Sequence, residues 1–236
     1  MNLPLNSTAD PSDPIVRARF NMIEQQIRPW NVLDEQVLEL LEKVRREDFV
    51  PPAYRAMAFM DTEIPLLGEP EQALRLGRCM LPPRVEARML QDLRPQPDDR
   101  VLEIGAGSGY MAALLASCTQ QVVSLDIVPE LAEFARRNLQ RAGIGNAHVR
   151  VADGAHDALP EGPFDIIVLS GSVGEIPARL LDQLRPGGRL GAIVGDEPIM
   201  RFTLVRQVEN RFEASQPWDC NAPRLLGFPE PVAFEF

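Results

Sequence analysis

The 236-residue chain contains few cysteines and histidines. Its three cysteines, Cys79, Cys118 and Cys220, lie far apart and are odd in number, which argues against a disulfide framework and favours a reducing cytoplasm. With two histidines and no ligand-like spacing, we expect no metal site. No apolar run has the length of a membrane span, and the first residues are polar, so we expect neither a membrane segment nor export.

Positive charge is also scarce. The chain has 24 Lys and Arg against 34 Asp and Glu, and its net charge is −10. A protein that follows a phosphate backbone needs a basic face, so we expect no nucleic-acid partner. Arginines between Arg17 and Arg28 and between Lys43 and Arg46 could form a local patch, but a solvated helix face explains them better.

The chain does have a glycine loop directly after an apolar segment. The predicted strand 101–104 leads into Gly105, Gly107 and Gly109, and a helix is predicted next. Glycines let the backbone turn tightly and approach a ligand closely, as in nucleotide-binding loops. Glu103 at the junction disfavours a pyrophosphate and suits a cofactor that carries an ammonium group and no phosphate. S-adenosylmethionine fits that description.

Two further predicted strands also end in acidic residues. One ends at Asp126, 21 residues after Gly105, which is near the spacing of about 20 at which a carboxylate reaches ribose hydroxyls. The next is followed by Asp153 and Gly154. Each acid alone could be an ordinary cap or turn residue. Because the carboxyl ends of parallel strands line the ligand crevice of an open sheet, we expect these acids to meet Glu103 there.

The remaining pattern predicts a doubly wound α/β fold. Helices are expected over 15–27, after Asp34, and over 83–93, 111–118, 129–143 and 175–184, and strands over 101–104, 121–126, 147–152, 164–169 and 189–194. Loops are expected over 60–82 and 170–174, a turn over 185–188, and two or three antiparallel strands after Met200. We expect a loose tail (1–14), N-terminal helices with a front loop (15–93) and a cofactor-binding core (94–236), with 15–236 forming one compact domain.

Several segments match one protein family. They are the glycine loop, Met22–Ile27, Val44–Pro51, Ala58–Leu66, Phe164–Val168 and Leu184–Leu190. In them the chain resembles the protein-L-isoaspartate O-methyltransferases, which are class I S-adenosylmethionine-dependent methyltransferases, over roughly residues 17–195. The resemblance implies a mostly parallel, seven-stranded, Rossmann-like sheet with an N-terminal helical extension. It also implies methyl transfer from S-adenosylmethionine to a carboxylate of L-isoaspartyl residues in damaged proteins or peptides.

The resemblance further implies the cofactor contacts. They are Glu103, Gly105 and Gly107 at the methionine part, Asp126 at the ribose, Asp153 and Gly154 at the adenine edge, and Ala106 and Ile127 beside them. These assignments agree with the roles argued from the three strand-end acids. The assembly is expected to be a monomer or a homodimer.

The chain departs from the family pattern where the acceptor should bind. The family's Gly-Gln-Thr-Ile-Ser-x-Pro reads Gly77-Arg78-Cys79-Met80-Leu81-Pro82-Pro83 here, so both hydroxyls are missing. Cys79, Leu81, Asp61 and Ser170 are the candidate acceptor-site positions. A small apolar filler explains Cys79 better than a nucleophile does, and Asp61 and Ser170 could equally be cap or turn residues. The change leaves open a different protein or small-molecule acceptor, or a cofactor-binding role without catalysis. An NAD-dependent dehydrogenase fits worst.

Overall fold

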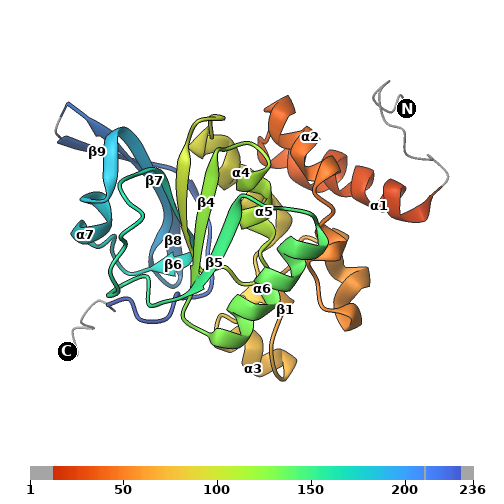
Figure 1. The fold of residues 1–236 in the computed structure, drawn as a ribbon. Helices are drawn as coiled ribbons and strands as arrows, with labels where there is room; N and C mark the ends of the chain where they lie inside the picture. Colours follow the sequence, from red (N-terminus) through yellow and green to blue (C-terminus); the bar gives the residue numbers. More distant parts are fainter. Residues whose placement is uncertain (1–12, 210, 230–236) are drawn as a thin grey trace.

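The computed structural model describes residues 13–209 and 211–229 (Figure 1). Residues 1–12, most of the predicted tail, lie outside the described residues. Pro14 already begins the first helix, and the carboxylate of Asp13 accepts a hydrogen bond from the backbone N–H of Ile15 at 2.8 Å. Pro14, which was predicted to belong to the loose tail, is therefore the first residue of a helix.

The N-terminal helices form as predicted. Helix α1 (Pro14–Met22) runs into a π-helical turn, η1 (Ile23–Ile27), and a short 3-10 helix, η2 (Arg28–Trp30). The carboxylate of Asp34 caps α2 (Glu35–Lys43) by accepting the N–H of Gln36 at 2.9 Å. Two more 3-10 helices follow, η3 (Arg46–Asp48) and η4 (Pro52–Phe59). The apolar side chains of this unit join the same core as helices α4 and α5 of the sheet domain, whose bounds are given below.

The front segment 60–82 is not the plain loop predicted from its sequence. It contains β1 (Ile64–Pro65), α3 (Pro70–Arg75) and β2 (Cys79–Met80), and β1 pairs with β2 in antiparallel register. Strands of two residues are too short to leave a periodic pattern, which is why the sequence does not reveal them. Helix α4 (Pro83–Leu93) follows with the bounds predicted.

A seven-stranded sheet forms the centre of the molecule (Figure 1). Its strands are β3 (Arg100–Ile104), β4 (Gln121–Asp126), β5 (Ala147–Val151), β6 (Phe164–Val173), β7 (Leu184–Asp196), β8 (Ile199–Val208) and β9 (Arg211–Asp219). The order is β5-β4-β3-β6-β7-β8-β9; the first five are parallel, and β8 and β9 add antiparallel strands at one end. The predicted doubly wound, mostly parallel sheet is confirmed.

Helices cover both faces of this sheet. Helices α4, α5 (Tyr110–Ala116) and α6 (Pro129–Arg141) pack on one face, and α7 (Ala178–Leu181) packs on the other. The chain winds from β3 outward to β5 and then returns to the other side of β3 with β6. In open α/β sheets such a switch point creates a crevice at the carboxyl ends of the strands, and ligands bind there.

Three predicted boundaries after Phe164 are wrong. The segment 170–174, predicted as a loop, belongs to β6 as far as Val173, because Ser172 pairs with β7 and exchanges backbone hydrogen bonds with Pro223 and Leu225. The helix expected over 175–184 shortens to α7. The predicted turn 185–188 lies inside β7, where the register with β6 shifts.

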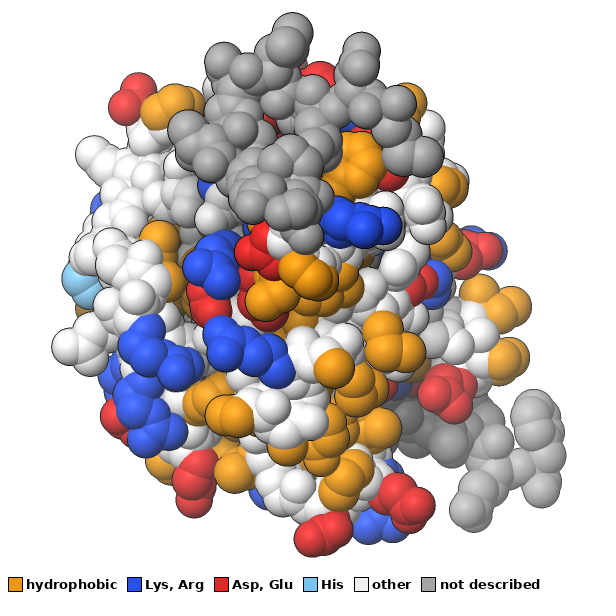
Figure 2. All heavy atoms as spheres, turned by 90° about the vertical axis from the view of Figure 1, so that its right-hand side faces the viewer, with side chains coloured by type: hydrophobic (Ala, Val, Ile, Leu, Met, Phe, Trp, Pro, Cys, Tyr) orange, Lys and Arg blue, Asp and Glu red, His pale blue; other side chains and the backbone are white. Residues whose placement is uncertain are grey.

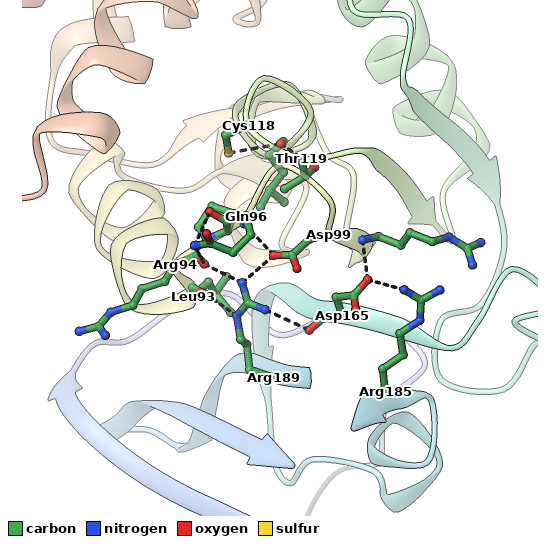
Figure 3. A network of polar contacts seen from close by, with 12 residues as sticks. Leu93, Arg94, Gln96, Asp99, Cys118, Thr119, Asp165, Arg185 and Arg189 are labelled. Carbon is green, nitrogen blue, oxygen red and sulfur yellow. Dashed lines mark hydrogen bonds and ion pairs between the residues drawn. The ribbon is translucent and has the colours of Figure 1, made fainter. Parts of the chain in front are cut away.

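The edge of the sheet opposite the crevice is held by a polar network (Figure 3). Arg189 donates to the carbonyl of Leu93 at 2.5 Å and to the carboxylate of Asp99 at 2.7 Å. Asp165 accepts from Arg185 at 2.9 Å. The network joins the C-terminal end of α4 to β7, so the helix that follows the front segment has a fixed position on the sheet.

Charges of both signs lie next to each other on the face that includes the N-terminal helices (Figure 2). Ion pairs join five cations of the two predicted groups to nearby acids. They are Arg28 to Glu24 at 2.7 Å, Lys43 to Glu39 at 3.1 Å, Arg45 to Glu47 at 3.2 Å, Arg19 to Glu47, and Arg46 to Glu86. Arg46 is fully buried, so the expectation of a solvated helix face is wrong for this residue. Among the described residues, no helix combines the length and the apolar character that crossing a bilayer requires.

Candidate functional site

A hollow opens at the carboxyl ends of β3, β4 and β6, and we call it the edge pocket. About 560 Å³ inside it is free of protein atoms, part of this space being open to solvent. The predicted site residues that line it are Cys79, Gly105, Gly107, Asp126, Ile127, Gly154 and Ser170. Five others do not line it: Asp61, Leu81, Glu103, Ala106 and Asp153.

The glycine loop forms the floor of the edge pocket through its backbone. Gly105 and Gly107 have φ of +97° and +51°, a region that side chains disfavour. A Cβ on Gly105 would lie 2.9 Å from Cδ2 of Leu225. The N–H groups of Gly105 and Ala106 both donate to the carbonyl of Leu125, at 2.8 and 2.9 Å, which fixes the loop to β4. Glycine is therefore required here both for the turn and for the space above it.

Asp126 joins the loop to the end of β4. Its side chain accepts the N–H of Gly107 through Oδ2 and the N–H of Val128 through Oδ1, both at 2.9 Å. Burial raises the pKa of Asp126, and the two backbone hydrogen bonds oppose that rise. Each carboxylate oxygen has a second lone pair. Asp126 can therefore hold the loop and still accept hydrogen bonds from the hydroxyls of a ribose, which is the donor set that S-adenosylmethionine presents.

Glu103 lies beneath the loop rather than in the edge pocket. Its side chain is fully buried and accepts hydrogen bonds from the hydroxyls of Ser124 at 2.5 Å and Ser170 at 3.0 Å. Burial raises its pKa to about 8, although both hydroxyls lower it. Ser170 lines the edge pocket and connects Glu103 to it. Direct contact of Glu103 with a cofactor stays a prediction. Ser124 was not among the predicted site residues, although parallel pairing of the two predicted strands places it beside Glu103.

Asp153 stabilises the turn after β5. Its carboxylate accepts the N–H of Ala155 at 2.8 Å and contacts Nδ1 of His156 at 2.9 Å. Burial alone would raise the pKa of Asp153, but these hydrogen bonds bring it below its usual value. The neighbouring Gly154 lines the edge pocket. An adenine contact for this pair of residues stays a prediction.

The acceptor-site candidates separate into two groups. Cys79 and Ser170 line the edge pocket, and burial raises the pKa of Cys79 to about 12, so it is a neutral thiol at pH 7. Leu81 is buried in the core, and its carbonyl accepts a hydrogen bond from Arg46 at 2.6 Å. Asp61 forms an ion pair with Arg84. The last two therefore have structural partners outside the pocket.

Two segments cover the edge pocket: the start of the predicted acceptor motif and a segment near the C-terminus that was not predicted to reach the site. One is 76–78, directly before Cys79, and the other is 224–226 near the C-terminus. The second follows β6 through the bonds that Ser172 makes, and Arg224 donates to the carbonyl of Gly195 at 2.9 Å and pairs with Asp196. A short extended segment without a long partner strand leaves no periodicity, so its sequence carried no signal. In the described part of the chain, no three His, Cys, Asp or Glu side chains are grouped as metal ligands would be.

Comparisons with known proteins place this architecture in a family. The family model described as protein-L-isoaspartate(D-aspartate) O-methyltransferase matches residues 17–217. A protein-L-isoaspartate O-methyltransferase of Methanoculleus marisnigri is 41% identical over 202 residues, which cover 86% of this chain and 88% of the relative. A protein-L-isoaspartate O-methyltransferase 2 of Marinobacter nauticus is 37% identical, with 89% and 93% covered.

Solved structures agree in fold. A putative protein-L-isoaspartate O-methyltransferase from Plasmodium falciparum, determined in complex with S-adenosyl-L-homocysteine, superimposes with a TM-score of 0.72 at 20% identity, covering 89% of this chain and 97% of that one. This likeness supports the fold alone, whereas the sequence similarity reaches across the N-terminal helices, the glycine loop and most of the sheet. The chain therefore belongs to the protein-L-isoaspartate(D-aspartate) O-methyltransferase family.

Proposed function

We propose that this protein is an S-adenosylmethionine-dependent O-methyltransferase whose acceptor is a carboxylate of L-isoaspartyl residues in damaged proteins or peptides. The observation that carries the proposal is the edge pocket, where the glycine loop and Asp126 meet the segment that corresponds to the family's acceptor motif. The relatives that match most of the chain carry the name of this activity, which favours it over another acceptor or a role without catalysis.

The residues of the edge pocket would act by positioning. The bound cofactor supplies a methyl group on a sulfonium. Gly105 and Gly107 would allow the backbone to approach the methionine part, and Asp126 would accept hydrogen bonds from the ribose hydroxyls. Gly154 would lie at the adenine edge, where a Cβ would clash with the side chain of Ile104. Holding the attacking oxygen and the methyl carbon about 3 Å apart and in line can supply several kcal/mol of the barrier reduction.

No general base is needed for this acceptor. A carboxylate has a pKa near 4 and is ionised at pH 7, so it attacks without losing a proton. This agrees with the described lining of the edge pocket, which includes no histidine.

The three cysteines are free thiols. We therefore also propose that the enzyme acts in the cytoplasm. Because the net charge is −10, we propose that its acceptors are isoaspartyl-containing proteins and peptides rather than nucleic acid.

Two measurements test the function. Calorimetry should detect binding of S-adenosylmethionine to the wild type, and Asp126→Ala should weaken it at least about tenfold because ribose hydrogen bonds are lost. Radiolabelled methyl transfer should then yield a base-labile ester on an isoaspartyl peptide and none on the same peptide with ordinary aspartate. Cofactor binding with no ester on the isoaspartyl peptide would refute the proposed activity.

A further inference from the structure

One cation in the edge pocket has no partner within residues 13–209 and 211–229. The charged residues that line the pocket are Arg78, Asp126 and Arg224. Asp126 accepts two backbone hydrogen bonds, and Arg224 pairs with Asp196. By contrast, the Nε atom of Arg78 is buried and has no hydrogen-bond partner among the described residues, and no ion pair joins its guanidinium to any of them. Of the two cations in the described pocket lining, Arg78 is therefore the one without an ion pair.

The position of Arg78 is fixed by the front segment. Its N–H donates to the carbonyl of Ala73 at 2.8 Å, and its own carbonyl accepts the N–H of Leu66 at 2.9 Å. The next residue, Cys79, lies over the glycine loop, since its carbonyl oxygen is 3.9 Å from where a Cβ on Gly107 would be. The half-buried side chain of Arg78 is therefore attached beside the part of the loop assigned to the methionine end of the cofactor, where the methyl group would be transferred.

A buried guanidinium nitrogen without a partner is costly, and for Arg78 this is Nε. The planar fork of a guanidinium matches a carboxylate in a two-point contact. The other donors expected at this position are missing. The family's two hydroxyls are replaced by a neutral thiol at Cys79, which is a weak donor, and by Leu81, which has no donor and does not line the pocket. An anion that enters here therefore has the guanidinium of Arg78 as its available charged partner.

We propose that Arg78 binds the carboxylate of the methyl acceptor and so takes over from the missing hydroxyls. The proposal rests on the function proposed above. With two N–H groups bound, each carboxylate oxygen keeps one lone pair, and one of these attacks. The new bond joins that oxygen to the methyl carbon, while the bond from methyl carbon to sulfur breaks and leaves its electron pair on sulfur. No proton moves. The ester is neutral, so Arg78 binds the product more weakly than the substrate.

The test compares Arg78→Met and Arg78→Lys with the control Arg206→Met. Arg206 is exposed on β8. In the antiparallel register of β7 and β8 it lies opposite Arg189, far from the edge pocket. We expect Arg78→Met to raise KM for an isoaspartyl peptide about 30-fold or more, as loss of a charged two-point contact predicts, while the Kd of S-adenosylmethionine changes less than about threefold. Arg78→Lys should recover part of the loss, and Arg206→Met should behave as wild type. Urea unfolding of each variant checks that the fold is kept.

Each outcome decides the proposal. If Arg78→Met weakens S-adenosylmethionine binding and leaves peptide KM unchanged, the partner is the carboxylate of the cofactor and the acceptor assignment is wrong. If neither value changes, Arg78 binds no carboxylate. If the wild type forms no ester at all, the proposed function fails by itself. Calorimetry of the isoaspartyl peptide with protein saturated with S-adenosylhomocysteine then tests Arg78 separately, and equal peptide Kd values for wild type and Arg78→Met would overturn the proposal.

Discussion

Replacing Arg46 by methionine should destabilise the protein mainly through loss of its buried ion pair with Glu86. Arg46 is fully buried and pairs with Glu86, which is 5% exposed. It also donates to the carbonyl of Leu81 at 2.6 Å, and its guanidinium carbon lies 5.1 Å from the ring centre of Tyr110. Methionine fills much of the same volume but leaves the carboxylate of Glu86 buried without a cation.

The magnitude follows from that unpaired carboxylate. Removing one partner of a buried ion pair costs about 3–5 kcal/mol in the free energy of unfolding. Burial raises the pKa of Glu86, whereas the positive charge of Arg46 lowers the pKa of Glu86. Arg46→Met removes that charge, so the pKa of Glu86 should be higher in the variant than in the wild type. The folded state then keeps a proton that the unfolded state loses above its ordinary pKa of 4.5. Stability contributed in this way falls as pH rises, so the deficit of Arg46→Met should be larger at pH 8 than at pH 5.

Urea unfolding at both pH values measures this, with Arg46→Met/Glu86→Leu as the matched control. Replacing both partners by apolar side chains removes the unpaired charge, so the double variant should recover most of the lost stability and lose the pH dependence of the deficit. A deficit below about 1 kcal/mol, or a double variant as unstable as Arg46→Met, would show that the buried pair does not carry this stability.

Two further substitutions test the glycine loop and the residue beneath it. Because burial raises the pKa of Glu103 to about 8, wild-type stability should fall as pH rises from 4.5 to 8. Between these pH values the free energy of unfolding, measured in urea, should fall by roughly 3–5 kcal/mol less in Glu103→Gln than in the wild type. If the free energies of unfolding of the two proteins change with pH in parallel, the prediction is wrong. Gly105→Ala places a methyl group 2.9 Å from Leu225 at φ +97° and should weaken S-adenosylmethionine binding at least about tenfold in calorimetry. Gly143→Ala, at φ +72° with open space around it, should leave that binding unchanged.

The meeting of the glycine loop with Asp126 at one sheet edge could be predicted because the parts that build it are close in sequence. A buried strand, a glycine loop and a helix follow one another, and each adds its signal within about a dozen residues. The strands ending at Ile104 and Asp126 are parallel neighbours in the structure, as that pattern requires. The role of Glu103 was harder to predict, because its position beneath the loop depends on hydroxyls from two other strands, Ser124 and Ser170.

The acceptor motif was recognised in the sequence, but the structure that covers the edge pocket could not be predicted, because distant segments build it. Residues 76–79 are held by a two-residue pairing of β1 with β2, and residues 223–225 follow β6 through a few backbone bonds. Neither pattern is long enough to show a period. The end of β6 was misplaced for a related reason. Ser172 and Val173 pair with Ile193 and Val194 of β7 only after a shift in register, and a shifted pairing cannot be read from the sequence.

The loss of two hydroxyls from the acceptor motif has a different meaning in the structure than in the sequence. Leu81 is held by its backbone carbonyl, which accepts a hydrogen bond from Arg46, and that contact does not depend on the side chain at position 81. The front segment can therefore keep its path over the glycine loop with leucine where the family has serine. What changes is the set of donors in the edge pocket, and the guanidinium of Arg78 is a stronger partner for a carboxylate than a hydroxyl. The altered motif is thus compatible with a working acceptor site that recognises the same anion through charge.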